Sequence, residues 1–303
     1  MRGLRRVDLQ STRRRREPRE GGVTAGRVVF ACLALGAALV GDGASAKTLA
    51  FAPRLAADAS AQATVNWSGY AATSPTAEAT PSSGSPLSFS DVTGSWVQPK
   101  ARCVKGRADA AAFWVGIGGF NEDSSTLQQV GTTAQCSSGG IATYFVWWEI
   151  VPAAEVRVPM KVRPGDRVTA AVLINGARVT MSIKNATRKT RFSTTVTVAQ
   201  PLDVSSAEWI AEAPTACTAS GACEVVPLTN FGSVMFGKAA ATANRMSGTI
   251  THRAWLATPL QLIPDTATGG LGAAPGALSP DGRSFRVTSQ RAESMLRPSR
   301  PAP

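Results

Sequence analysis

Histidine is almost absent from this sequence, and its scarcity removes several classes of catalytic site. The 303 residues contain one histidine, His252, and no H-E-x-x-H pair, G-x-S-x-G elbow, P-loop or pair of D-T/S-G motifs. Zinc peptidases, α/β-hydrolases, P-loop NTPases and aspartic proteases each depend on one of these patterns. A hydrolytic mechanism in this chain would have to use carboxylates, amides and aromatic side chains. The strand-like stretch THRAW around His252 favours a core or cross-strand role.

Long apolar runs are also missing. The longest, VVFACLALGAALVG over residues 28–41, has about 14 residues, whereas a transmembrane helix needs about 20. It follows nine arginines in residues 1–27 and precedes an A-x-A site. This order predicts a secretory signal peptide over residues 1–46, cleaved near Ala46. We therefore expect a secreted protein, extracellular or periplasmic, that is not held in a membrane after cleavage.

Positive charge is concentrated near the two ends of the chain. The formal net charge is +12, of which residues 1–46 contribute +5 and residues 266–303 contribute +3, so residues 47–265 carry only about +4. No basic patch interleaved with aromatic residues occurs in that central stretch. A nucleic-acid partner is therefore not expected.

Cysteine is sparse, and its number limits the possible cross-links. Of five cysteines, Cys32 lies in the apolar run, so four remain after cleavage. An even number in an exported protein predicts two disulfides with three possible connectivities, and the spacing favours Cys103 with Cys136 and Cys217 with Cys223. The sequence has no C-x-x-C motif and one histidine, which argues against a structural zinc site. We expect no metal or cofactor.

Short runs of β-branched and aromatic residues dominate residues 65–265, separated by glycine, proline, asparagine and serine. No segment has a long apolar period of 3.6 residues, so helices are not expected. The pattern predicts an all-β domain of a dozen or so short antiparallel strands, arranged as one two-sheet β-sandwich. Residues 47–64 are expected to form a short pro-segment or disordered lead, and residues 266–303 a disordered basic tail.

Two glutamates lie four residues apart in the stretch SAEWIAEAPTACTASGAC, residues 206–223. In a strand, Glu208, Ile210 and Glu212 share one face, and the two carboxylates stand about 13 Å apart. The paired carboxylates of glycosidases stand about 5 to 9.5 Å apart, so at most one glutamate can be at a reaction centre. The alternative is that both are solvated strand residues.

Tryptophan is frequent, with seven residues, and most of them should fill the core. Trp147 and Trp148 are neighbours in a predicted strand, so they point to opposite faces of the sheet. One of them is therefore expected to look across a sheet surface, either as a partly buried rim residue or as a wall of a substrate cleft.

Eight short motifs occur in a fixed order along the chain: NWSGY, GSWVQP, FWVGIGG, LQQVGT, WWEIVP, PGDRV, AEWIAE and PLTNFG. Together they resemble the glutamic peptidases, the eqolisin or G1 family, formerly grouped as A4, over about residues 65–250. The resemblance implies a concanavalin-like β-sandwich of two antiparallel sheets, about seven strands each, with one face curved into a substrate cleft. It also implies metal-free hydrolysis of peptide bonds at acidic pH.

The resemblance also implies the site residues. The catalytic pair carries over to Gln129 in LQQVG and to Glu212, which precedes Cys217 by five residues, with Glu208 as the second choice. A glutamate can act as general base toward water, and a glutamine amide can stabilise the oxyanion. The substrate-binding residues carry over to Trp114, Trp147 and Glu149. The expected substrates are proteins and peptides, and the enzyme is expected to be a monomer that pepstatin does not inhibit. The alternative functional class is a secreted module that binds a glycan or peptide without cutting it.

The chain departs from the family pattern at Gly118, where the family usually has an aspartate. Loss of an acidic neighbour and the positive net charge should both lower carboxyl pKa values. The sequence therefore predicts an acidic pH optimum of activity, with both limbs of the pH–rate profile at lower pH than in a relative that keeps the aspartate. In the variant Gly118→Asp both limbs should move partly back to higher pH.

Overall fold

The computed structural model describes residues 61–75, 86–218 and 222–291, and every regular element in them is a β-strand. The predicted signal peptide and residues 47–60 of the predicted lead lie outside the described residues. Within the described part, no helix is long and apolar enough to cross a membrane. The all-β, antiparallel prediction is confirmed, because the only parallel pairing among the described strands joins β1 (Gln62–Thr64) to β16.

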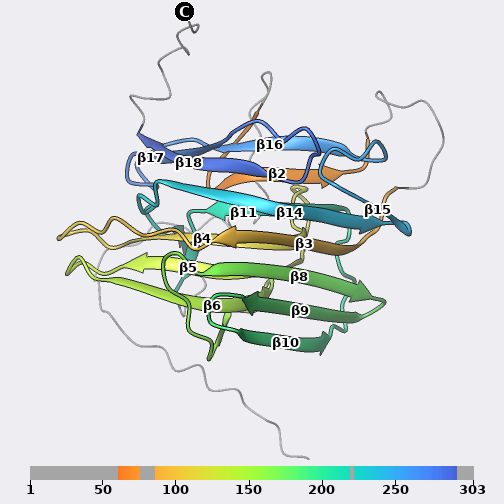
Figure 1. The fold of residues 1–303 in the computed structure, drawn as a ribbon, viewed down its shortest axis with the longest axis horizontal. Helices are drawn as coiled ribbons and strands as arrows, with labels where there is room; N and C mark the ends of the chain where they lie inside the picture. The colour runs from red at the N-terminus through yellow and green to blue at the C-terminus, as the bar shows by residue number, and fades with distance from the viewer. Residues whose placement is uncertain (1–60, 76–85, 219–221, 292–303) are drawn as a thin grey trace, which may run out of the picture. The chain divides into compact units, whose positions relative to one another are not determined.

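The main path of the sheet folds into two layers of seven strands each. Figure 1 labels these strands. The first layer, in spatial order, comprises β10 (Thr190–Thr197), β9 (Arg178–Asn185), β8 (Arg167–Asn175), β3 (Phe89–Val97), β14 (Ser233–Ala243), β18 (Phe285–Arg291) and β17 (Leu271–Pro275). The second comprises β16 (Leu256–Leu262), β2 (Trp67–Thr73), β11 (Ser206–Glu212), β4 (Asp109–Gly118), β5 (Leu127–Cys136), β6 (Ala142–Ile150) and β7 (Val156–Val158). The short strand β15 (Met246–Gly248) pairs with β14, and β12 (Thr215–Cys217) with β13 (Cys223–Val225) forms a separate hairpin.

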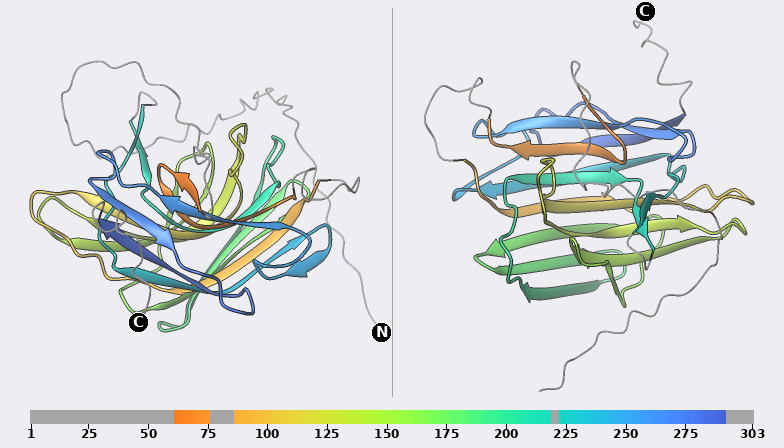
Figure 2. Two further views of the ribbon diagram at one scale, coloured as in Figure 1. Left: turned by 90° about the horizontal axis from the view of Figure 1, so that it is seen from above. Right: turned by 180° about the vertical axis from the view of Figure 1, so that it is seen from behind.

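The prediction of two separate sheets is wrong, because the two layers are one continuous hydrogen-bonded sheet. They join where Leu262 of β16 pairs with Ala273 of β17. The connection between these strands turns back through Gly269 and Gly270, both with positive φ, a conformation that glycine adopts without steric cost. Because this connection is short, β17 stays beside β16 and also begins the other layer. Figure 2, seen from above, shows the resulting fold of one layer over the other.

The core between the layers is held by aromatic side chains whose polar atoms bond across it. Trp209 of β11 is fully buried and donates from Nε1 to the carbonyl oxygen of Thr93 in β3 at 2.8 Å. Trp96 of β3 donates in the other direction, to the Thr132 hydroxyl of β5 at 3.0 Å. Tryptophan can be buried at low cost when its N–H finds such a partner. These contacts fix β11 and β5, the two strands that carry the predicted catalytic pair.

The predicted disordered tail is wrong over residues 266–291, which contain β17 and β18. Phe285 and Val287 of β18 are buried, and β18 pairs with β14. The segment contains few large apolar residues, so its composition suggested disorder. Its small residues, such as the fully buried Ala273, pack closely because partners far away in sequence supply the rest of the core. At the other end, β1 occupies the last residues of the predicted lead.

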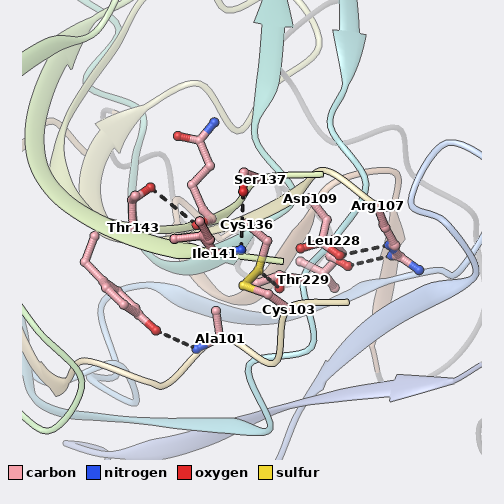
Figure 3. Close-up of a disulfide and its surroundings, with 12 residues drawn as sticks. Ala101, Cys103, Arg107, Asp109, Cys136, Ser137, Ile141, Thr143, Leu228 and Thr229 are labelled. Carbon is pink, nitrogen blue, oxygen red and sulfur yellow. Dashed lines mark hydrogen bonds and ion pairs between the residues drawn. A yellow bond between two sulfur atoms is a disulfide. The ribbon is translucent and has the colours of Figure 1, made fainter. Parts of the chain in front are cut away.

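Both predicted disulfides are confirmed. Cys103 bonds to Cys136 and ties the loop before β4 to the end of β5 (Figure 3). Beside this bridge, Arg107 forms a salt bridge with Asp109 and donates to two backbone carbonyl oxygens. Cys217 bonds to Cys223 and closes the hairpin of β12 and β13, which follows β11 directly. A bridge over a loop of this kind stabilises chiefly by restricting the unfolded chain, by about 2 kcal/mol or more.

Candidate active site

The outward face of the second layer gathers the predicted site residues from four neighbouring strands, β11, β4, β5 and β6. Strand pairing places Glu212 beside Trp67 of β2 and Ala112 of β4. Four residues away on the same strand, Glu208 lies beside Ala71 of β2 and Gly116 of β4. Because side chains alternate along a strand, these residues share one face. Gln129 and Glu149 continue the row of Glu208 and Gly116 on β5 and β6.

A cavity of about 360 Å³ opens on this face. Glu212 lines it from β11, Gln129 from β5, and Glu149 and Trp147 from β6. The hairpin closed by Cys217 and Cys223 borders the cavity next to Glu212. Other lining residues include Trp67, Leu127, Thr133, Gln135, Phe145, Glu155, Arg157 and Thr215. Aromatic walls with a few convergent polar groups are typical of a ligand site.

Glu212 is held by three N–H groups. The carboxylate oxygen Oε1 accepts from Asn66 Nδ2 at 3.1 Å and from Trp67 Nε1 at 3.3 Å, and Oε2 accepts from Trp114 Nε1 at 2.7 Å. Burial raises the pKa of Glu212 to about 8; the bond from Trp114 lowers the pKa, and the charge of Glu149 raises it. The donors fix the orientation of the carboxyl group, and Oε2, which accepts one hydrogen bond, can accept another.

Gln129 and Glu149 form a hydrogen-bonded pair on the opposite wall. The Nε2 atom of Gln129 donates to Glu149 Oε2 at 2.6 Å. Gln129 is 5% exposed, and its Oε1 atom is buried without a hydrogen-bond partner. Burial is the main cause that raises the pKa of Glu149 to about 7; the bond from Gln129 lowers it and the charge of Glu155 raises it. The second N–H of the Gln129 amide remains available to a substrate.

Glu208 has a different environment. Its side chain is fully buried, and neither carboxyl oxygen has a hydrogen-bond partner among the described residues. Burial raises the pKa of Glu208 well above the usual range; the nearby Ser206 hydroxyl lowers it, although its oxygen forms no hydrogen bond of normal geometry with the carboxyl group, and the charge of Asp203 raises it. It is absent from the cavity wall that Glu212 lines. Of the two glutamates in AEWIAE, the structure therefore places Glu212 at the cavity.

The sequence matches the Peptidase A4 family over residues 65–262, which is more than half of the chain. The chain belongs to the peptidase A4 family. The resemblance inferred from its motifs is thereby confirmed. A comparison with curated proteins gave no match.

Solved structures of glutamic peptidases share the fold of this A4 family member. The crystal structure of scytalido-glutamic peptidase with a transition state analog inhibitor superposes with a TM-score of 0.59 at 20% sequence identity, covering 75% of this chain and 98% of that chain. SCP-B, described as a member of the eqolisin family in a complex with the tripeptide Ala-Ile-His, gives a TM-score of 0.54 at 20% identity, with the same two coverages. At this identity the likeness concerns the fold alone.

Trp114 supports the site from beneath and does not line the cavity. Its side chain is fully buried, and its one polar atom bonds to Glu212. Two glycines make room for it, because a Cβ atom on Gly116 or Gly131 would stand 2.9 Å or 2.6 Å from Trp114. Of the predicted substrate-binding residues in this A4 family member, only Trp147 and Glu149 line the cavity. The indole of Trp147 is fixed by a 2.8 Å bond to Thr133.

Sequence reasoning missed several residues that shape the site. Asn66 and Trp67 belong to the motif NWSGY, which was recognised without a role, and both donate to Glu212. Arg157 lies 3.8 Å over the Phe145 ring and bonds to Glu155 at 3.2 Å on the cavity wall. The pairing of β7 with the preceding strand β6 places Arg157 opposite Trp147, and the motif WWEIVP ends before β7, so it did not include Arg157.

The space next to Gly118 is taken by Asp203. Gly118 has a φ of +84°, and a Cβ atom there would stand 2.5 Å from the Asp203 carbonyl oxygen. The Asp203 carboxylate accepts from the Gly119 N–H and the Ser124 hydroxyl. Burial opposes ionisation, but the bonds from Ser124 and Ser205 keep the pKa of Asp203 below its usual value. An acidic group therefore remains in this corner although residue 118 is glycine.

No group of three or more histidine, cysteine, aspartate or glutamate residues that could hold a metal ion occurs in the described ranges. His252 bonds locally, its Nδ1 atom accepting from the Ala254 N–H at 3.2 Å, and its ring contacts Trp255. Both residues lie in the connection before β16, outside the cavity.

Proposed function

We propose that this protein is a secreted endopeptidase that hydrolyses peptide bonds with Gln129, Glu212 and an activated water molecule, without a metal ion. One observation carries the proposal. A carboxyl group oriented by three N–H donors and a glutamine amide with a spare N–H line the same cavity in a member of the peptidase A4 family. Substrates would be proteins and peptides lying along the aromatic wall.

The reaction needs one base and one hydrogen-bond donor. Ionised Glu212 takes a proton from the water molecule while the water oxygen attacks the scissile carbonyl carbon. The carbonyl oxygen becomes negative. The spare N–H of Gln129 donates to this oxygen, an interaction worth about 2.7 to 4 kcal/mol in comparable sites. The tetrahedral intermediate then collapses, the C–N bond breaks, and Glu212 returns the proton to the leaving nitrogen. Trp114, Trp67 and Asn66 keep the carboxylate oriented throughout.

The pH range follows from the carboxyl pair. The reaction needs one proton on the pair, with Glu212 ionised and Glu149 protonated. The pKa of Glu212, about 8, is higher than that of Glu149, about 7, so the proton resides more often on Glu212 and the active form is the smaller fraction of the singly protonated pair. Burial raises the pKa of both groups, so the active, singly protonated form lies at higher pH than two ordinary glutamates would give. The expected shift to lower pH rested on net charge and on Gly118. In this cavity burial changes the carboxyl pKa values more than the net charge or Gly118 does, and it raises them instead of lowering them. We therefore propose activity from weakly acidic to neutral pH.

Digestion of denatured casein by the purified mature protein tests the proposal. The assay spans pH 2 to 8 with pepstatin present, and mass spectrometry identifies the new peptide ends. Internal cleavage that resists pepstatin and peaks above pH 4.5 is expected. Casein or glycan binding without any new peptide ends in wild-type protein would favour the binding module instead and would reject the peptidase.

A further inference from the structure

Cations are concentrated in one segment of the chain, of which only Arg157 lines the cavity. Residues 156–202 contain nine lysines and arginines and a single acid, Asp166, a net charge of +8. Residues 47–265 as a whole carry only about +4, so the remainder of that stretch is acidic by about four charges. The segment forms β7 to β10, and β8, β9 and β10 lie at one edge of the first layer. Such segregation creates a local positive field that the net charge conceals.

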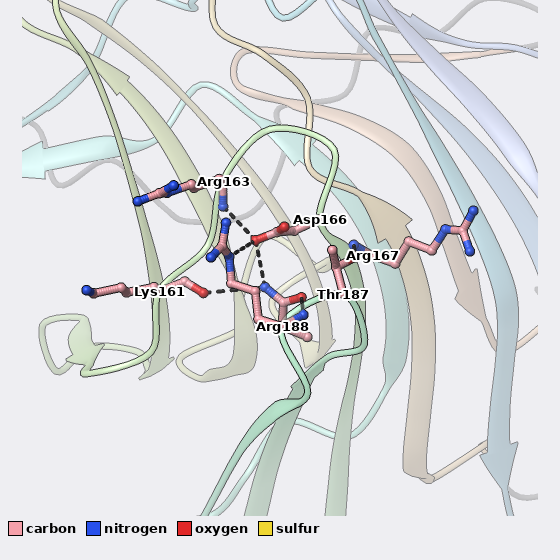
Figure 4. A network of polar contacts seen from close by, with 7 residues as sticks. Lys161, Arg163, Asp166, Arg167, Thr187 and Arg188 are labelled. Atoms are coloured by element: carbon pink, nitrogen blue, oxygen red, sulfur yellow. Dashed lines mark hydrogen bonds and ion pairs between the residues drawn. The ribbon is translucent and has the colours of Figure 1, made fainter.

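The single acid of the segment neutralises only one of these cations. Asp166 is 3% exposed, and its Oδ2 accepts from the Arg163 N–H at 2.9 Å, Asn185 Nδ2 at 2.8 Å and Arg188 Nε at 2.5 Å (Figure 4). Figure 4 also shows the side chain of Arg167 pointing away from Lys161 and Arg163. Asp166 is therefore used within the fold. Arg157 pairs with Glu155, just before the segment, and the other cations form no ion pair among the described residues.

Three of the remaining cations surround a shallow hollow at the turn between β9 and β10. Lys184, Lys189 and Arg191, which we call the turn cluster, line it together with Ala186 and Thr190. Lys184 and Arg191 are exposed and directly opposite each other across the two strands. Like charges in such a pair destabilise the sheet. An anion bound in the hollow would remove that repulsion.

A strip of hydroxyl side chains continues from the turn cluster along the same face. Ser182 pairs with Ser193 and Thr180 with Thr195, and the two threonine hydroxyls bond at 2.9 Å. The exposed Arg178 ends the strip. From Lys184 to Arg178 the strip is about 20 Å long, because a strand rises about 3.4 Å per residue. This length exceeds a single small anion and fits an extended chain with several anionic groups.

We propose that the turn cluster and the hydroxyl strip bind an extended anionic polymer bearing sulfate or phosphate groups. Lys184, Lys189 and Arg191 would pair with the anionic groups, and the serine and threonine hydroxyls would donate to the oxygens between them. The surface lies on the first layer, whereas the cavity opens on the second. Polymer binding would therefore hold the protein on an anionic matrix while the cavity stays accessible.

Heparin serves as the sulfated probe and long-chain polyphosphate as the phosphate probe. The double variant Lys184→Glu/Arg191→Glu is compared with Lys105→Glu/Arg253→Glu, which makes the same change in net charge at two exposed sites outside the surface. The wild type should bind one or both probes more weakly as salt rises. The turn-cluster variant should lose at least about tenfold in affinity and the control less than about twofold, with thermal unfolding of both close to wild type. Replacing both cluster residues by threonine gives a milder variant if charge reversal impairs folding.

Equal losses in the two charge-reversal variants would overturn the proposal, because the binding would then depend on net charge alone. No binding of either polymer at low salt would also overturn it. Vesicles containing anionic lipid form a separate arm. If the turn cluster governs vesicle binding and not polymer binding, the surface recognises a lipid headgroup layer and the polymer proposal is rejected.

Discussion

The two ends of strand β11 carry the same side chain on the same face in opposite environments. Glu212 meets three N–H donors and lines the cavity, whereas Glu208 is fully buried without a partner. Their neighbours explain the difference. Glu212 lies beside Trp67 and near Trp114, whereas Glu208 lies between Ala71 and Gly116, which carry no donor in their side chains. The role of a strand glutamate is therefore decided by the adjacent strands.

Exchange of each glutamate for glutamine is the strongest test of this comparison. Glu212→Gln removes the base and should lower kcat by about 10³-fold or more, since general base catalysis contributes about 10² to 10⁴. Glu208→Gln should stay within about tenfold of wild type. Initial rates on one peptide, with circular dichroism as a check on folding, measure both. The assignment of the base to Glu212 fails if the larger loss belongs to Glu208→Gln.

Gln129 allows a second comparison within β5. Gln129→Ala removes the proposed oxyanion donor and should lower kcat by about 10²- to 10³-fold with little change in KM. Gln135→Ala is the matched control, because Gln135 lies on the same strand and lines the same cavity at its exposed end. It should change kcat less than about threefold. Equal losses in the two variants would mean that β5 contributes through packing and not through the amide.

Strand positions and cross-links followed from the sequence because they depend on local patterns. The alternation in SAEWIAE put Trp209 inside and the glutamates outside, and the cysteine spacing indicated both bridges. The joining of the layers at Leu262 and Ala273 depends on partners far apart in sequence, so composition could not show it. The same holds for the site: motif order gave Gln129 and Glu212, but the burial of Trp114 and the approach of Asp203 to Gly118 arise only from packing.

The variant Gly118→Asp tests the end of β11 that carries Glu208. The sequence predicted that this aspartate would restore an acidic neighbour and move the pH limbs partly upward. The structure corrects that prediction. An aspartate at a φ of +84° is strained by about 1 to 3 kcal/mol, and its Cβ would collide with the Asp203 carbonyl oxygen. We expect a lower free energy of unfolding by at least that amount and no upward shift of the pH limbs. Urea unfolding and pH–rate profiles measure the two effects. A stable Gly118→Asp protein with shifted limbs would show that Asp203 does not fill the position.

Trp114→Phe sharpens the comparison at the Glu212 end. The variant keeps a large ring beneath the cavity but removes the N–H that bonds to Glu212 at 2.7 Å. That bond lowers the pKa of Glu212, so its loss should raise the pKa and move the acid limb of kcat/KM to higher pH, with a loss of about tenfold in kcat. Trp147→Phe, which loses a bond to Thr133 instead, should mainly raise KM. Identical acid limbs in Trp114→Phe and wild type would exclude this positioning role.

The smallest expected effect concerns stability. The pKa of Glu208 in the folded protein is raised above its ordinary value of 4.5, so the folded state binds more protons than the unfolded chain. The stabilisation by this group is therefore complete below pH 4.5 and is lost as pH rises from there toward the folded-state pKa. Glu149 and Glu212 act in the same direction in every variant compared. The variant Glu208→Gln removes only the pH-dependent stabilisation that Glu208 contributes. The free energy of unfolding of this variant should therefore fall less between pH 4 and pH 8 than that of the wild type. Urea unfolding at the two pH values decides it, and parallel changes would mean that Glu208 has a partner that keeps it ionised.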